Sequence, residues 1–84
     1  MNDQQLIDRG VSAQELLSNE TFQNLSKELL DHYIATFLAT SPEDSNGRNS
    51  AYFQCRALQD LIAVLQQWVY VKDNIINKTS EEEI

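Results

Sequence analysis

The feature that most constrains this chain is a heptad pattern of apolar residues in its second half, over residues 46–77. Counted from Leu58, the pattern advances by alternating steps of three and four residues, which is the period of an α-helix and not of a strand. Its members are Leu58, Leu61, Leu65, Trp68, Lys72 and Ile75, with Ile62, Val69 and Ile76 directly beside them. Phe53, Ala57, Val64 and Val71 widen the apolar arc to roughly half of the helix circumference, so we expect two neighbours for this helix.

A second helix is predicted over residues 21–40, before the long one. Its apolar positions again follow steps of one, three and four residues: Phe22, Leu25, Leu29, Leu30, Tyr33, Ile34, Phe37 and Leu38. Pro42 ends it, because proline lacks the N–H group and disfavours helical geometry in the preceding residue. Asp44, Ser45 and Asn46 are all suitable N-caps, so the long helix is expected to begin between residues 45 and 50.

The first residues of the chain indicate a short third helix. Ser12 and Glu15 have the spacing of a capping box, which predicts a helix over residues 13–18. Residues 1–11 are expected to form an arm or a short helical turn on the body, and Ser18 and Asn19 to restart the chain. The predicted division is an arm (1–11), a helical hairpin domain (12–77) and a flexible acidic tail (78–84).

These segments predict an all-α fold, with a short N-terminal helix followed by a long antiparallel helical hairpin. With 84 residues, one cysteine and no disulfide, a single core is only marginally sufficient. We therefore expect two chains to pair into a four-helix bundle. The expected core and interface residues are Leu58, Leu61, Ile62, Leu65, Trp68 and Val69. Lys72 lies on the same stripe, where its stem can extend along the interface or its charge can meet an acidic residue of a partner.

The charge of the chain bears on its partners and location. Thirteen acidic and six scattered basic residues give a net charge of −7, which repels nucleic-acid phosphates and anionic lipid headgroups. We therefore expect no nucleic-acid partner and no membrane. There is no signal-peptide pattern, and a lone cysteine in an apolar helix is typical of a reducing compartment. The expected location is the cytoplasm, or a virion if the protein belongs to a phage.

No catalytic, cofactor-binding or metal site is predicted. Glu28 and His32 are one helical turn apart, but two such ligands leave a metal coordination sphere incomplete. Cys55 lies inside an apolar helix, where a thiol commonly packs as a small hydrophobe. An enzyme would require Cys55, His32 and a carboxylate to converge across an interface between chains. Tyr70 lies toward the polar face of the long helix and is a possible partner-binding patch.

Several local patterns resemble small acidic helical-hairpin proteins of tailed bacteriophages, which are encoded near the head and packaging genes. The similar segments are residues 22–30 (FQNLSKELL), 40–44 (TSPED) and 56–61 (RALQDL), together with Arg48 and Tyr52. The resemblance covers roughly residues 12–75, and it implies a phage accessory or head-assembly protein with no established activity. The function expected is a non-enzymatic, oligomeric protein-interaction module, with a homodimer or another phage structural protein as partner. The alternative is a DNA-packaging or regulatory protein such as a small terminase subunit.

Overall fold

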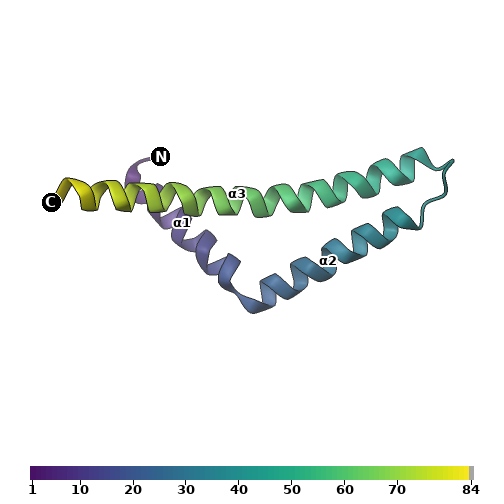
Figure 1. Ribbon diagram of the computed structural model, residues 1–84, viewed down its shortest axis with the longest axis horizontal. Coiled ribbons are helices and arrows are strands. Elements are labelled where there is room, and N and C mark those ends of the chain that lie inside the picture. The colour runs from purple at the N-terminus through teal and green to yellow at the C-terminus, as the bar shows by residue number, and fades with distance from the viewer. Residues whose placement is uncertain (84) are drawn as a thin grey trace.

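The computed structural model describes residues 1–83, and the side chains of residues 1–81, and it confirms the all-α prediction. Three helices follow one another: α1 (Asp3–Ser18), α2 (Glu20–Leu38) and α3 (Ser45–Glu83). Residues 1–83 contain no strand. Figure 1 shows α3 as one long rod, with α1 and α2 running back along it and meeting at a corner that points away from α3.

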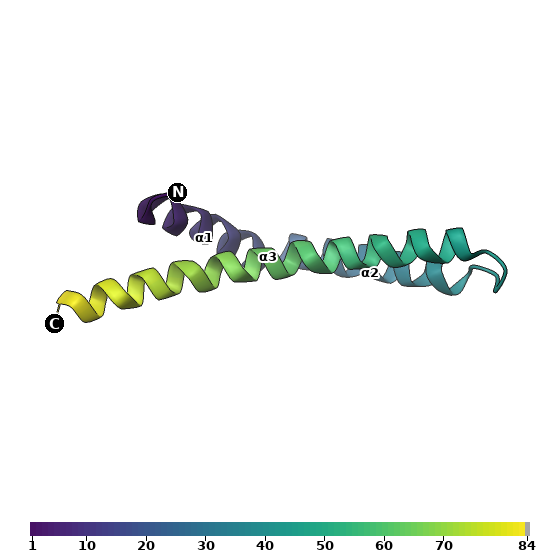
Figure 2. The ribbon, with the colours of Figure 1, turned by 90° about the horizontal axis from the view of Figure 1, so that it is seen from above.

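The molecule is much longer than it is wide. Its extents are 62 × 24 × 18 Å and its radius of gyration is 17.9 Å. A compact chain of this length would have a radius of gyration of about 12 Å. Seen from above in Figure 2, α2 follows one half of α3, while α1 lies against the other half and to one side of it. Along most of its length α3 therefore has one helical neighbour within the chain, while its last turns extend beyond α1.

The helix α1 begins earlier than the sequence pattern suggested, and the predicted cap at Ser12 is wrong. Asn2 Oδ1 accepts a hydrogen bond from the backbone N–H of Gln5 at 2.8 Å, and Gln5 Oε1 accepts one from the N–H of Asn2 at 3.0 Å. This reciprocal pair is a capping box that starts the helix nine residues before Ser12. Ser12 lies inside the helix, where the backbone N–H of Glu15, which a cap at Ser12 would satisfy, already has a helical acceptor.

The corner between α1 and α2 is a single residue, Asn19, in an extended conformation. Its backbone N–H donates to Leu16 O at 3.1 Å, and its side-chain Oδ1 accepts from the N–H of Phe22 at 2.8 Å. Asn19 thus ends one helix and caps the next, as its residue type predicted. Since α2 runs from Glu20 to Leu38, the predicted bounds of 21 and 40 are off by one and two residues.

The connection from α2 to α3 contains Pro42, after the end of α2, and Asp44, one of the expected N-caps, caps α3. Asp44 Oδ1 accepts a hydrogen bond from Gly47 N–H at 2.9 Å, so α3 starts at Ser45, the earliest of the expected positions. Arg48 Nη1 donates to the carbonyl oxygens of Ser41 and Pro42, which fixes the turn against the first turn of α3. The other end of α3 lies at Glu83, so the predicted end at Asn77 is wrong. The predicted tail (78–84) is thus helical through Glu83, and Ile84 lies outside the described residues.

The helices α1 and α3 pass close to each other at Gly10 of α1. A Cβ atom on Gly10 would lie 2.4 Å from Lys72 Cβ and 2.8 Å from the carbonyl oxygen of Trp68. Both atoms are fixed by the backbone of α3, so only glycine allows this approach. Ala13, one turn later, is 3% exposed. The short side chains of α1 therefore bring it close to α3, and α1 makes more contacts with α3 than α2 does.

The buried interior is small. Among residues 1–81 the buried apolar side chains are Ala13, Ala51 and Leu65, and two of these are alanines. Against α3, α2 places the half-buried residues Phe22, Ser26, Leu30 and Tyr33 at helical spacing. A chain with so little buried apolar volume depends strongly on each close contact that it makes.

We predict that Gly10→Ala destabilises the protein despite the better helix propensity of alanine. Alanine favours a helix interior by about 1 kcal/mol, but overpacking at a close contact typically costs 1–3 kcal/mol, about as much or more. Urea unfolding followed by circular dichroism measures the change. Ser12→Ala is the matched control, since Ser12 is exposed on the same helix and should gain stability. A Gly10→Ala variant at least as stable as Ser12→Ala would contradict the close crossing.

Candidate interaction surface

An apolar stripe runs along the middle of α3 and is exposed to solvent. It consists of Phe53, Ala57, Leu61 and Val64, which we call the central stripe. Phe53 is 65% exposed, Leu61 50% and Val64 40%, and Ala57 is exposed as well. Steps of four, four and three residues place them on one helix face. A single exposed leucine is ordinary on a protein surface, whereas a continuous row of apolar side chains indicates an interaction site.

A groove of about 420 Å³ lies inside the corner formed by α1 and α2. Its floor and walls are mainly apolar, and its polar members are Ser26, Lys27 and three glutamines. The lining residues are Leu17, Phe22, Gln23, Ser26, Lys27 and Leu30 from the first half of the chain, and Leu58, Gln59, Ile62, Ala63 and Gln66 from α3. No carboxylate, histidine or cysteine is among these lining residues.

The groove and the central stripe lie on opposite sides of α3. At about 100° per residue, the α3 residues that line the groove are centred roughly half a turn away from Phe53, Ala57, Leu61 and Val64. The central stripe therefore cannot be covered by α2 or by the corner. α1 covers the neighbouring face of α3 further along, at Leu65 and Lys72, and leaves the central stripe open.

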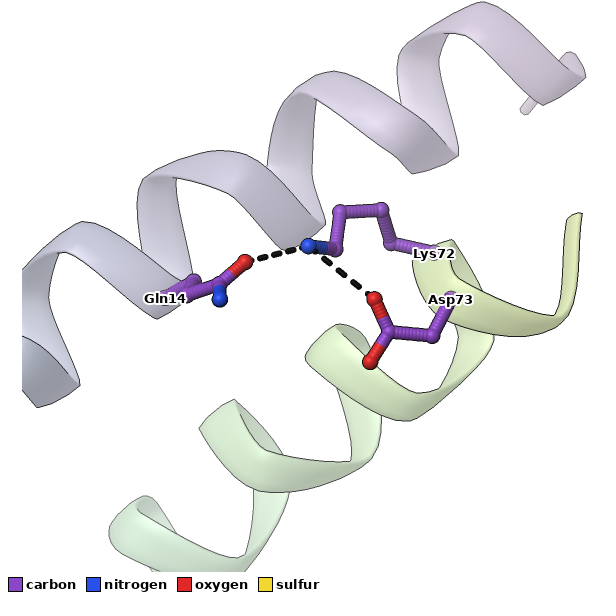
Figure 3. Close-up of polar contacts among 3 residues, drawn as sticks. All are labelled: Gln14, Lys72 and Asp73. Carbon is purple, nitrogen blue, oxygen red and sulfur yellow. Dashed lines mark hydrogen bonds and ion pairs between the residues drawn. The ribbon is translucent and has the colours of Figure 1, made fainter. Parts of the chain in front are cut away.

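The polar centre of the α1–α3 contact is Lys72, which is 7% exposed. Its Nζ donates to Gln14 Oε1 of α1 and forms an ion pair of 3.1 Å with Asp73 Oδ1 (Figure 3). The structure places the stem of Lys72 along α1 of its own chain, whereas both roles expected for this lysine were at an interface between chains. Its charge meets an amide and the neighbouring carboxylate of its own chain. A buried ammonium group requires such acceptors, because without them it would lose its hydration uncompensated.

A second cation, Arg9, covers the aromatic anchor of the same contact. The guanidinium carbon of Arg9 lies 4.3 Å from the centre of the Trp68 ring, a cation–π geometry. Arg9 Nη1 also donates to the sulfur of Met1 at 3.3 Å. Arg9 Nε is buried and has no hydrogen-bond partner among the described residues. The arginine therefore holds the N-terminal end of α1 against α3 mainly through the ring.

The structure distributes the predicted core and interface residues over two roles. Leu65 is buried, and Leu58, Ile62, Trp68 and Val69 are half-buried. Leu61 remains half exposed and belongs to the central stripe. Tyr70 is 66% exposed, and its role in binding a partner stays a prediction. Gly10 and Gln14 were missed, because nothing in the sequence links them to a lysine about sixty residues later.

The residues considered for chemistry lie apart from the groove. His32 is exposed on α2, with Glu28 and two leucines around a shallow depression, and Cys55 is half-buried on α3. Asp60 pairs with Arg56 at 3.3 Å on the exposed side of α3, and Asp73 pairs with Lys72. Within residues 1–83, no three His, Cys, Asp or Glu side chains gather as a metal site. The chemistry that the described surface supports best is apolar contact with another macromolecule.

Comparison with protein-family models, with curated proteins and with solved structures finds no match for this chain. Over residues 1–83, none of the helices carries the long apolar run that crossing a membrane requires.

Two substitutions separate the charge of Lys72 from its apolar stem. We predict that Lys72→Met leaves the melting temperature unchanged or raises it, because methionine keeps the stem and removes a desolvated charge. Gln14→Leu should destabilise the protein by about 1–3 kcal/mol, since the ammonium group loses its acceptor on α1. Thermal unfolding of both variants and of the double variant provides the comparison. A Lys72→Met variant less stable than Gln14→Leu would show that the charge itself stabilises the contact.

Proposed function

We propose that this protein is a non-enzymatic protein-interaction module that acts as a homo-oligomer, with two chains pairing their helical hairpins into a four-helix bundle. The observation that carries this function is the amount of apolar surface that one chain leaves uncovered. Beyond the central stripe, Leu25, Leu29, Ile34, Phe37 and Leu38 of α2 are each at least 38% exposed. A partner would cover what the chain cannot cover alone.

The total surface area supports the same function. The chain exposes 6342 Å², whereas a compact monomer of its mass exposes about 5,100 Å². The excess, roughly 1,200 Å², exceeds the ~800 Å² that each partner contributes to a typical stable interface. One interface of ordinary size would therefore bring the surface of each chain to that of a compact protein.

The acidic surface has a role in this function. A net charge of −7 keeps chains apart wherever they meet at random. Apolar contact can overcome this repulsion only where the surface is free of acidic residues. Association is thereby restricted to particular faces of the molecule, and specificity benefits from the repulsion elsewhere.

The biological setting that we propose is a phage particle or its assembly, on the basis of the resemblance in residues 12–75. A rod 62 Å long with exposed apolar faces is suited to bridging other proteins. Head assembly requires small proteins that bind other proteins without catalysing a reaction.

Oligomerisation is directly measurable. We predict that sedimentation equilibrium at micromolar concentration gives a mass of about two chains, and that the melting temperature rises with protein concentration because folding and association are linked. A fully helical monomer with a melting temperature independent of concentration would contradict the oligomeric function.

The DNA-packaging alternative gives a separate prediction. Because the net charge is −7 and no two basic residues are adjacent, we expect no change in the electrophoretic mobility of duplex DNA at moderate ionic strength. The protein should be assayed at concentrations at which it is fully associated. A mobility shift that weakens as salt is raised would favour the DNA-packaging function instead.

A further inference from the structure

We propose that the central stripe is the surface on which a second copy of this chain docks, with the two α3 helices antiparallel and the contact centred near residue 59. This pairing rests on the proposed function, and it specifies the partner, the surface and the orientation. The residues of the central stripe, Phe53, Ala57, Leu61 and Val64, are all exposed within one chain.

The order of residue sizes along the stripe matches an antiparallel copy of itself. A two-fold interface requires that residue i of one chain contacts residue j of the other, and the reverse. In antiparallel register about residue 59, the small Ala57 lies opposite the larger Leu61 of the other copy. In the same register Phe53 lies within one residue of the position opposite Val64, which is smaller than phenylalanine. Each large side chain thus meets a smaller one, and this arrangement lets two helices approach closely.

The distribution of charge favours the same surface. Asp60 is the only acidic residue between Ser45 and Lys72, although the chain has thirteen acidic residues. Asp60 is already paired with Arg56 at 3.3 Å. The net negative charge therefore lies outside the middle of α3, and two copies can meet there with little repulsion.

Charge also distinguishes the two orientations. α3 ends in consecutive glutamates at positions 81–83, and Asp73 precedes them. In a parallel pair these acidic ends would lie side by side, which is unfavourable. In an antiparallel pair they lie at opposite ends of the assembly, separated by most of its length. The second copy is therefore expected to run in the opposite direction.

Distances between spin labels test the orientation. In a Cys55→Ser background, single cysteines at the exposed positions Gln67 and Asn74 would each carry a nitroxide label. In the antiparallel pair each residue further from the centre adds about 3 Å, twice the helical rise, which gives ~25 Å at position 67 and ~45 Å at position 74. Pulsed dipolar spectroscopy on the full-length protein measures both distances. A parallel pair would give nearly equal distances at the two positions, and an antiparallel pair centred elsewhere would change both distances by about 3 Å for each residue by which the centre moves. Either result would overturn the inference.

A substitution on the stripe tests the surface independently. Leu61→Glu should weaken dimerisation by about 100-fold or more, because it places an unpaired charge in an apolar contact. Ile76→Glu is the matched control on α3: Ile76 is also aliphatic and is 43% exposed, close to the 50% of Leu61, but it lies away from the stripe, so the dissociation constant should not change. Circular dichroism at high concentration verifies that both variants remain helical. If the Leu61→Glu variant dimerises as tightly as the parent protein, the inference is overturned, even where the parent is a helical dimer.

The outcomes separate the inference from the proposed function. A dimer whose label distances do not increase from position 67 to position 74 overturns the antiparallel central-stripe pairing and leaves the oligomeric function intact. A protein that remains monomeric at micromolar concentration overturns both. A dimer with ~25 Å and ~45 Å separations, dissociated by Leu61→Glu and unaffected by Ile76→Glu, establishes the pairing.

Discussion

The rest of the structure depends on the contact between α1 and α3 at Gly10. Because Gly10 has no side chain, its backbone approaches the Cβ atom of Lys72 and the carbonyl oxygen of Trp68 closely enough to exclude any other residue. This approach places Gln14 within reach of the Lys72 ammonium group and Arg9 over the Trp68 ring. Without it, the second half of α3 would have no neighbour within the chain.

The same contact explains how a charged residue occupies a core position. Lys72 falls on the apolar heptad, and its stem is covered by the backbone of α1 at Gly10. Its ammonium group reaches the edge of the contact, where it donates a hydrogen bond to Gln14 Oε1 and pairs with the Asp73 carboxylate. The cost of desolvation is limited because Asp73 is half exposed, so the pair stabilises the contact only modestly. The lysine thus specifies how α1 lies on α3 more than it strengthens the contact.

The local signals in the sequence predicted the helices well and their relative arrangement poorly. Asn19 and Asp44 are caps whose geometry depends on a few adjacent residues, so residue type was sufficient to place them. The spacing of Ser12 to Glu15 satisfies the capping pattern equally well inside a helix, so it predicts a helix start where there is none. The local sequence around Gly10 predicts only an arm, since the role of this glycine becomes visible when Lys72 is beside it. Contacts between distant residues cannot be read from local periodicity, and the α1–α3 crossing is of that kind.

The break at Asn19 explains why the apolar excess remains on α3. α1 directs Leu6, Gly10, Ala13 and Leu17 toward α3, at steps of four, three and four. The next covered position, Phe22, comes five residues later, and in a continuous helix it would be rotated by about 140° from Leu17. The extended residue at Asn19 corrects the phase, so that both helices present apolar residues to α3, but it also turns them through a corner. Two helices meeting at a corner cannot both follow a straight rod, and they contact it on adjacent faces. The apolar face from Phe53 to Val64, on the side of α3 away from the groove, is then left uncovered within the chain. In the proposed pairing the straight α3 of a second copy covers it.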